Sequence, residues 1–221
     1  MSERLWIIGP REDGWSLGAT ADIEFLAYED LGQAQNAPWV IDPSSGPLTE
    51  KRQRLWALEE LGVQVALTAS TTATVAAQQY WLKGTMRLVG CDPLLMMAGG
   101  HVQTVVQATD VDFAWLSSVW PDRRFVATED SVGLVFSREI LPIVNEAADF
   151  LSKGVPVDDI DRGVCLGLNY PRGPIAWANL FGWSEVFWGL WALQDMYGER
   201  FRPHPWIRKK VGSSLMGELD C

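Results

Sequence analysis

The sequence predicts an α/β fold followed by an all-α region, with a mostly parallel sheet in the first part. Short apolar runs alternate with helical patterns as far as Asp130, which is typical of a parallel sheet covered by helices on both faces. Beyond that point amphipathic segments follow one another and no strand pattern remains. We therefore expect two domains, residues 1–130 and residues 131–221.

Seven segments have the length and apolar character of buried strands. They are residues 4–8, 22–29, 38–42, 63–70, 86–91, 101–109 and 123–130. Gly14 lies too close to the second strand for a normal crossover, because parallel strands need a connection of at least about 10 to 12 residues including its helix. We therefore expect the first helix to be shortened or missing.

Helices are predicted where apolar residues recur three and four positions apart. In residues 49–61, Leu55, Leu58 and Leu61 share the apolar face, the charged residues lie elsewhere, and Gly62 ends the helix. The other predicted helices are residues 72–81, 111–120, 137–153, 155–168, one or two within 175–198, and a short one in 203–211.

Composition excludes several classes of function. The net charge of −10 argues against a non-specific nucleic-acid binder and against docking on an anionic membrane. No apolar run approaches the roughly 20 residues that span a bilayer, and the N-terminal run is too short for a signal peptide, so we expect a cytoplasmic protein. The cysteines Cys91, Cys165 and Cys221 are far apart and form no metal-binding pattern, which predicts incidental thiols and no metal site.

The turn after the first strand has the spacing of a dinucleotide-binding fingerprint but lacks its middle glycine. Gly9 and Gly14 stand at the outer positions, and Arg11 stands where bare backbone would approach a pyrophosphate. Glu12 and Asp13 add negative charge. Gly9, Arg11 and Gly14 are therefore candidates for a degenerate cofactor site. An ordinary solvated turn is the favoured interpretation, and phosphate binding by Arg11 is the alternative.

Three segments of the second half carry a family resemblance. REILPIVNEA (138–147) resembles the N-R-x-x-x-P-x-x-N-E-A opening of the C-terminal domain of 3-hydroxyacyl-CoA dehydrogenases, and residues 154–183 and 197–211 continue it in order. The NYPRGP version looks most like the diverged second half of two-part dehydrogenases of phenylacetate and related acyl-CoA catabolism. The first half resembles the family's Rossmann-like NAD-binding domain more weakly.

The resemblance implies a hydride transfer between a 3-hydroxyacyl-CoA and NAD, with a His as base, a Glu that orients it and an Asn that binds substrate. In this chain the segment that would carry the His is absent after residue 91, and the next His is His101. The Glu position falls on Thr104 or Gln103, and the Asn position is Ser137. No residue is therefore predicted to be catalytic.

Three hydroxyl residues remain as candidate substrate ligands: Ser70, Thr71 and Ser137. The structural alternative is that Ser70 or Thr71 caps the next helix and that Ser137 caps the helix that follows it. The Trp and Phe residues of 177–191 have helical spacing, which predicts core or interface. The resemblance favours the interface, because the helical domains of these dehydrogenases pair.

Three hypotheses follow. The preferred one is a catalytically impaired homologue that acts as an assembly or accessory subunit, as a homodimer or with an active dehydrogenase subunit, without a cofactor. The second is an active dehydrogenase with rearranged site residues, which would use NAD. The third is an acyl-CoA-binding or sensing protein.

Overall fold

The computed structural model describes residues 4–9, 13–16 and 18–212, and the chain divides into two compact units, residues 1–135 and 136–221. The first unit holds a seven-stranded sheet in the order β2-β1-β3-β4-β5-β6-β7, in which β5 and β6 alone pair antiparallel. The predicted mostly parallel sheet is thus confirmed. The strands are β1 (Arg4–Ile8), β2 (Asp22–Leu26), β3 (Trp39–Asp42), β4 (Val65–Ala69), β5 (Arg87–Cys91), β6 (Val102–Val106) and β7 (Arg124–Ala127).

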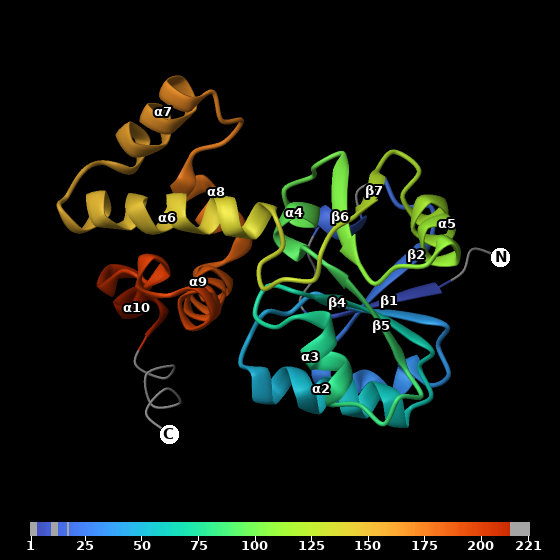
Figure 1. Cartoon of the computed structure of the whole chain (residues 1–221). Coiled ribbons are helices and arrows are strands. Elements are labelled where there is room, and N and C mark those ends of the chain that lie inside the picture. Colours follow the sequence, from blue (N-terminus) through green and yellow to red (C-terminus); the bar gives the residue numbers. More distant parts are fainter. Residues whose placement is uncertain (1–3, 10–12, 17, 213–221) are drawn as a thin grey trace. The chain divides into compact units, whose positions relative to one another are not determined.

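Helices cover both faces of this sheet (Figure 1). They are α1 (Asp13–Ser16), the 3-10 helix η1 (Tyr28–Ala34), α2 (Leu48–Glu60), α3 (Val75–Tyr80), α4 (Pro93–Met97) and α5 (Asp110–Val119). The first helix is four residues long, as the short crossover predicted. The helix α4 was not predicted; it is a single turn capped by the side chain of Asp92.

The side chains of β1 show how the two faces are filled. Trp6 and Ile8 pack in the core under α2 and α3, whereas Leu5 and Ile7 pack in the core that contains Trp120 of the α5 end. Because both faces are buried, the strand reads as a continuous apolar run rather than an alternating one.

The second unit is helical throughout its described part. It comprises α6 (Phe136–Ser152), α7 (Val157–Leu168), α8 (Pro174–Phe181), α9 (Trp183–Tyr197), the 3-10 helix η2 (Glu199–Phe201) and α10 (Pro205–Val211). Trp177, Phe187 and Trp188 are buried inside this unit, so these aromatic residues form its core. No helix in the described part of the chain is both long and apolar enough to cross a membrane.

Candidate functional site

The candidate site lies at the carboxyl ends of the parallel strands. In open α/β sheets, ligands bind at the carboxyl ends of two adjacent strands whose following connections run to opposite sides of the sheet. Here β1 lies between β2 and β3, so this point falls between the ends of β1 and β3. The loops after β1, β3, β4 and β5 therefore define the site to be tested.

Of the three predicted cofactor residues, Gly9 and Gly14 are described, and Arg11 lies outside the described residues. Gly9 has a φ of +116°, which glycine adopts without strain, and its amide donates to the carbonyl of Leu26 at 2.8 Å. Gly14 lies against α4, where a Cβ would come within 2.6 Å of the Met97 Cα. The packing of α1 on α4 therefore requires glycine at position 14, whether or not a ligand binds.

Aromatic and cationic side chains hold α1 in place. Trp15 is fully buried and meets Trp120 edge-on at 6.3 Å between ring centroids, and the Trp120 indole donates to the Trp15 carbonyl at 2.9 Å. The buried guanidinium of Arg123 donates to the Gly14 carbonyl at 2.7 Å, and burial lowers the pKa of this arginine. Packing thus fixes this helix in the absence of a ligand.

These residues do not fit NAD in the way that the fingerprint would hold it. A pyrophosphate is stabilised at the start of a helix by free backbone N–H groups and by the aligned dipoles of several turns. The helix α1 has a single turn, Asp13–Ser16, so it lacks the aligned dipoles of a longer helix. Its position is set by packing contacts instead.

A tyrosine and an arginine lie beside the turn after β1. The Tyr28 hydroxyl is 3.8 Å from where a Cβ of Gly9 would lie. Its ring lies 4.9 Å from the Arg54 guanidinium carbon, which is a cation–π distance. Segments from η1 and α2 therefore meet next to the turn.

Three buried charged residues lie where β3 ends. Asp42 accepts from Arg54 Nε at 3.3 Å and lies 3.9 Å from Lys51 Nζ, which donates to the carbonyl of Ser44 at 2.8 Å. Sequence reasoning placed the charged residues of this helix away from its packed face, which is wrong for Lys51, Arg54 and Glu59. One sequence feature could have indicated this cluster: Asp42 ends an apolar run, and Lys51 and Arg54 lie three positions apart on the same face of the next helix.

The predicted hydroxyl ligands Ser70 and Thr71 follow β4 and are buried. Within the described residues, neither hydroxyl has a hydrogen-bond partner. The Ser70 Oγ lies 2.5 Å from where a Cβ of Gly90 would be, so glycine on β5 makes room for it. Thr72, the next hydroxyl, donates to the carbonyl of Ser45 at 2.8 Å.

The expectation that Ser70 or Thr71 caps the next helix is wrong. Thr74 is the N-cap of α3, and its Oγ1 accepts from the amide of Ala77 at 3.2 Å. Asp130, from the loop after β7, accepts from the amides of Val75 and Ala76 at 2.9 and 2.8 Å. A carboxylate from the chain itself thus occupies the start of this helix.

The histidine and carboxylate pair of the family is not assembled around His101. This residue is exposed, and its Nδ1 lies 3.5 Å from the backbone carbonyl of Asp122; within the described residues it makes no ion pair. Gln103 turns inward and donates to the carbonyl of Gly100 at 2.6 Å. Thr104 offers a hydroxyl, not a carboxylate.

Ser137 is fully buried in the first turn of α6, which begins at Phe136. The expectation that it caps this helix is wrong, because it lies one residue inside. The second described histidine, His204, is the N-cap of α10; its Nδ1 accepts from the amide of Trp206, and its Nε2 lies 3.7 Å from Asp149 Oδ1. This histidine therefore has a structural role in the helical unit.

The described residues offer no metal site. They contain no group of three or more His, Cys, Asp or Glu side chains that could hold an ion. Burial raises the pKa of the Cys91 thiol, so this cysteine is unreactive at neutral pH.

Side chains from the sequence motifs of the helical unit form hydrogen bonds to backbone groups of neighbouring segments. Asn145 of α6 donates to the carbonyl of Arg202 at 2.9 Å and accepts from the amide of His204 at 2.8 Å. Asp161 of α7 accepts from the first amides of α8, those of residues 175 and 176, at 2.8 and 3.0 Å. A Cβ on Gly173 would lie 2.2 Å from the Cβ of Asp161, which explains the glycine of the NYPRGP turn.

Comparison with known proteins supports the resemblance. Residues 133–219 match the model of the 3-hydroxyacyl-CoA dehydrogenase, C-terminal domain. The chain is 36% identical over 121 residues to the 3-hydroxyadipyl-CoA dehydrogenase of Escherichia coli K12, which covers 52% of this chain and 26% of that protein. Residues 133–219 therefore form a C-terminal domain of the 3-hydroxyacyl-CoA dehydrogenase type, and this chain spans about a quarter of the length of the E. coli relative.

Two further matches extend over most of this chain. A 3-hydroxybutyryl-CoA dehydrogenase of Clostridioides difficile is 25% identical over 199 residues, which are 86% of this chain and 70% of that protein. The crystal structure of M. tuberculosis FadB2 superposes on this chain with a TM-score of 0.71 at 15% sequence identity. The superposition covers 96% of each of the two chains. The second likeness shows the fold, which is that of a Rossmann-like sheet unit followed by helices.

Proposed function

We propose that this 3-hydroxyacyl-CoA dehydrogenase homologue is catalytically impaired and acts as an assembly or accessory subunit in acyl-CoA catabolism. The observation that carries the proposal is the environment of His101, which faces a backbone carbonyl instead of a carboxylate. Without that carboxylate the imidazole is neither oriented nor stabilised as it takes a proton. The one-turn α1 and the buried Ser137 support the same conclusion.

The test is an assay of NADH formation. Because the relatives are named for 3-hydroxybutyryl-CoA and 3-hydroxyadipyl-CoA, these two thioesters are the substrates to supply with NAD. We expect no turnover above the uncatalysed rate, with the E. coli enzyme as positive control. Turnover that disappears in His101→Ala would contradict the proposal and favour an active enzyme with rearranged residues, with NAD as its cofactor.

A second candidate function is acyl-CoA binding without catalysis. It is favoured by polar atoms that are buried near the carboxyl ends of the central strands. Among the described residues, Arg54 Nη2 and the hydroxyls of Ser70 and Thr71 lack hydrogen-bond partners. A ligand that satisfied them would stabilise the fold. A rise in melting temperature with acetyl-CoA or a longer acyl-CoA, but not with NAD, would support this candidate, and no shift with either would count against it.

An accessory subunit in this family would act through its helical unit. Co-purification of an active 3-hydroxyacyl-CoA dehydrogenase with the tagged chain from its own cells would support an accessory role. The phenylacetate pathway is the first place to look for that enzyme, because the NYPRGP segment resembles the two-part dehydrogenases of that catabolism.

A further inference from the structure

The strand β2 is one edge of the sheet and pairs with β1 alone. In dinucleotide-binding sheets with the strand order 3-2-1-4-5-6, a third strand lies on the outer side of the second one. In this chain residues 27–38, which connect β2 to β3, hold the 3-10 helix η1 and no strand. Within the described residues, no strand therefore takes the outer place beside β2.

The backbone of β2 presents two residues to this edge. The Gly9 amide donates to the carbonyl of Leu26, so the N–H and C=O groups of Leu26, and of Glu24 two residues before it, point toward β1. The N–H and C=O groups of Ile23 and Phe25 therefore point outward, and no residue in the described part of the chain forms a hydrogen bond with them. An edge of this kind is a template for one more strand.

The side chains of the same two residues are only partly covered. Ile23 and Phe25 pack against the core that contains Trp120, yet both keep some exposure. By contrast, Leu5 and Ile7 on the neighbouring strand are 2% and 0% exposed. A strand added beside β2 would bring apolar side chains next to this pair and extend the core. The segment that fits the edge is therefore apolar at alternate positions.

The other face of β2 is acidic. Residues 18–38 carry four acids and no lysine or arginine: Asp22, Glu24, Glu29 and Asp30. Glu24 meets Arg4 of β1 at 3.1 Å in an exposed pair, and Asp22 is exposed and forms no ion pair with any described residue. Because side chains alternate between the two faces of a strand, cations at the remaining positions of the segment would lie over these acids.

Charge disfavours a second copy of this chain as the added strand. If Ile23 faces Ile23 of the second copy in an antiparallel pair, Asp22 faces Glu24. If Ile23 faces Phe25, Glu24 faces Glu24. Like charges directly opposite each other destabilise a strand pair, and acids on an edge strand protect it from self-association. The occupant of the edge is therefore a different chain.

We propose that β2 takes up an extended segment of a partner protein, in which basic residues alternate with apolar ones, as a further strand of the sheet. The backbone of the segment bonds to that of Ile23 and Phe25, and its apolar side chains cover these two residues. Its cations lie over Asp22 and Glu24. This interaction goes beyond the proposed function and does not depend on whether the chain turns over a substrate.

The experiment uses the full chain, isotope-labelled for NMR, and a synthetic peptide of about eight residues in which lysine alternates with valine. Hydrogen exchange then reports each amide by itself. In the free chain, the amides of Ile23 and Phe25 should exchange faster than that of Glu24, which bonds to β1. With saturating peptide, exchange at Ile23 and Phe25 should slow at least about tenfold, because both amides gain a backbone acceptor.

Methylation of backbone nitrogens in the peptide distinguishes strand addition from general attraction. Successive N–H groups of a strand point to opposite edges, so only one alternate set in the peptide faces β2. A peptide methylated on the backbone nitrogens of its lysines and one methylated on those of its valines should therefore differ. One of the two should fail to bind, and the other should bind as the unmethylated peptide does.

Charge exchange tests the acidic face. A peptide with glutamate in place of lysine should bind at least about tenfold more weakly in a fluorescence anisotropy titration. Asp22→Lys should reduce the affinity for the lysine peptide and raise that for the glutamate peptide. Asp195→Lys, at an exposed acid of α9, is the matched control and should change neither affinity.

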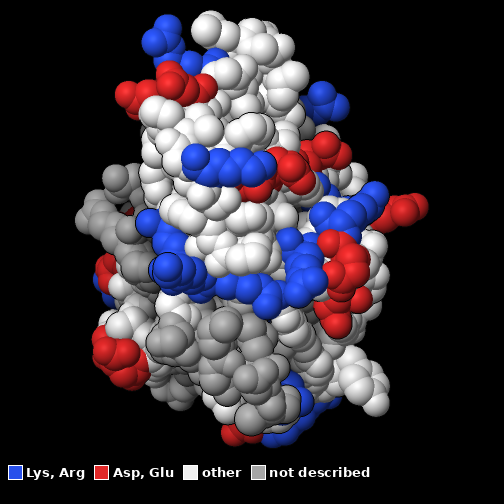
Figure 2. Space-filling model, turned by 90° about the vertical axis from the view of Figure 1, so that its left-hand side faces the viewer, with Lys and Arg blue, Asp and Glu red and all other residues white. Residues whose placement is uncertain are grey.

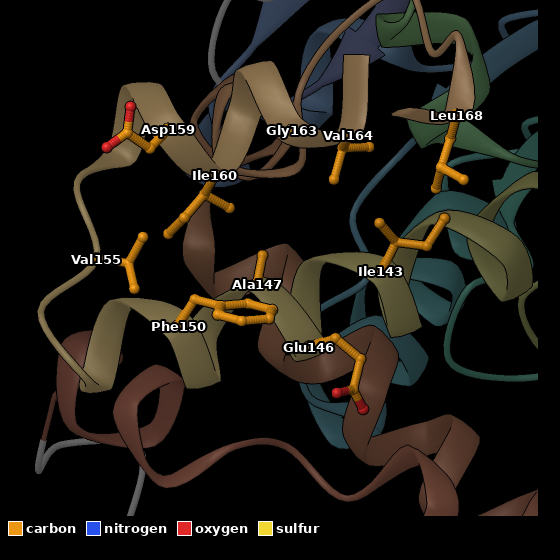
Figure 3. Close-up of a pocket in the computed structure, with 10 residues that line it drawn as sticks. All are labelled: Ile143, Glu146, Ala147, Phe150, Val155, Asp159, Ile160, Gly163, Val164 and Leu168. Atoms are coloured by element: carbon orange, nitrogen blue, oxygen red, sulfur yellow. The ribbon is translucent and has the colours of Figure 1, made fainter. Parts of the chain in front are cut away.

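Two other surfaces bear on the specificity of binding. The apolar groove of about 460 Å³ between α6 and α7, into which Ile143 and Phe150 point in Figure 3, could accept valine side chains. Gly163→Phe fills this groove, and nothing lies within 4 Å of the position of its Cβ, so binding at β2 should be unchanged. Lys and Arg side chains form a band on one side of the molecule in Figure 2, and a lysine peptide is repelled there.

The proposal is overturned if the lysine peptide shows no binding at about 1 mM, if the glutamate peptide binds equally well, or if exchange at Ile23 and Phe25 does not change. Protection of these two amides that grows with chain concentration in the absence of peptide would assign the edge to a second copy and would also overturn it. None of these outcomes depends on turnover, so catalytic impairment is tested separately by NADH formation.

Discussion

Glu59 provides the sharpest test of how the sheet unit is held together. Its carboxylate accepts from four consecutive backbone amides in the loop before β5: Lys83 at 2.8 Å through Oε2, and residues 84, 85 and 86 at 2.9, 2.9 and 3.3 Å through Oε1. The side chain is buried, so water cannot replace these bonds. Glu59→Gln keeps the shape but removes the charge and turns an NH₂ group toward one of the amides.

The expected loss is at least about 3 kcal/mol in the free energy of unfolding. A hydrogen bond to a charged group contributes roughly 1.5–3 kcal/mol and a neutral one about 1, and the amide variant loses one bond and weakens three. Burial alone would raise the pKa of Glu59, but the bonds from residues 83, 85 and 86 outweigh it, and the pKa is below the ordinary value. The stabilisation is therefore fully present above the unfolded pKa of about 4.3 and is lost as the pH falls through the lower folded value.

The assay is urea unfolding at pH 7 and pH 4, with hydrogen exchange on peptides of β4 and β5 to follow the sheet unit by itself. Glu60→Gln is the matched control, because Glu60 is exposed and pairs only with the exposed Lys83 ammonium among described residues, so its loss should cost less than 0.5 kcal/mol. If Glu59→Gln matched the control at pH 7, or if its deficit grew on acidification, the reasoning would be refuted.

Three other substitutions test the remaining contacts. Asp161→Ala should destabilise the helical unit by about 1–2 kcal/mol and speed protease cleavage of α7, because two amides of α8 lose their acceptor, whereas the exposed Asp158→Ala should do neither. Gly173→Ala should cost about 1–3 kcal/mol in a thermal melt, since its Cβ would overlap Asp161. Asp42→Asn should cost about 3 kcal/mol in urea unfolding, since it leaves Lys51 and Arg54 buried together; Lys51→Met should cost less, and the reverse order would contradict the assigned pairing.

Local sequence patterns predicted the parallel sheet because each buried strand is an apolar run bounded by turn residues. They did not predict α4, since a one-turn helix such as Pro93–Met97 is too short to show a 3.6-residue period and depends on its Asp92 cap. The N-cap of α3 was misplaced among neighbouring hydroxyls. Thr74 was the correct one, and the Asp130 carboxylate that assists it comes from a loop 55 residues away.

The candidate site was harder to predict than the fold, because its polar residues are defined by tertiary contacts. Lys51 and Arg54 read as solvated charges on a helix until Asp42 of β3 is placed beside them. At the positions that the family pattern gives to the carboxylate, Gln103 and Thr104 can be identified from residue types alone, and the absence of a catalytic carboxylate there stays a prediction.

The motifs that residues 133–219 share with 3-hydroxyacyl-CoA dehydrogenases are of a different kind from those that would give activity. Asn145 and Asp161 bond to backbone amides or carbonyls of the helical unit, and Gly173 is required by Asp161. Each of these contacts stabilises the helices whether or not a reaction occurs, so their presence is expected in an active enzyme and in an inactive subunit alike. The candidate site residues lie elsewhere, at the carboxyl ends of the sheet strands and at Ser137. The family-model match over residues 133–219 therefore identifies the architecture of the helical unit, and activity has to be decided by assay of the chain and of His101→Ala.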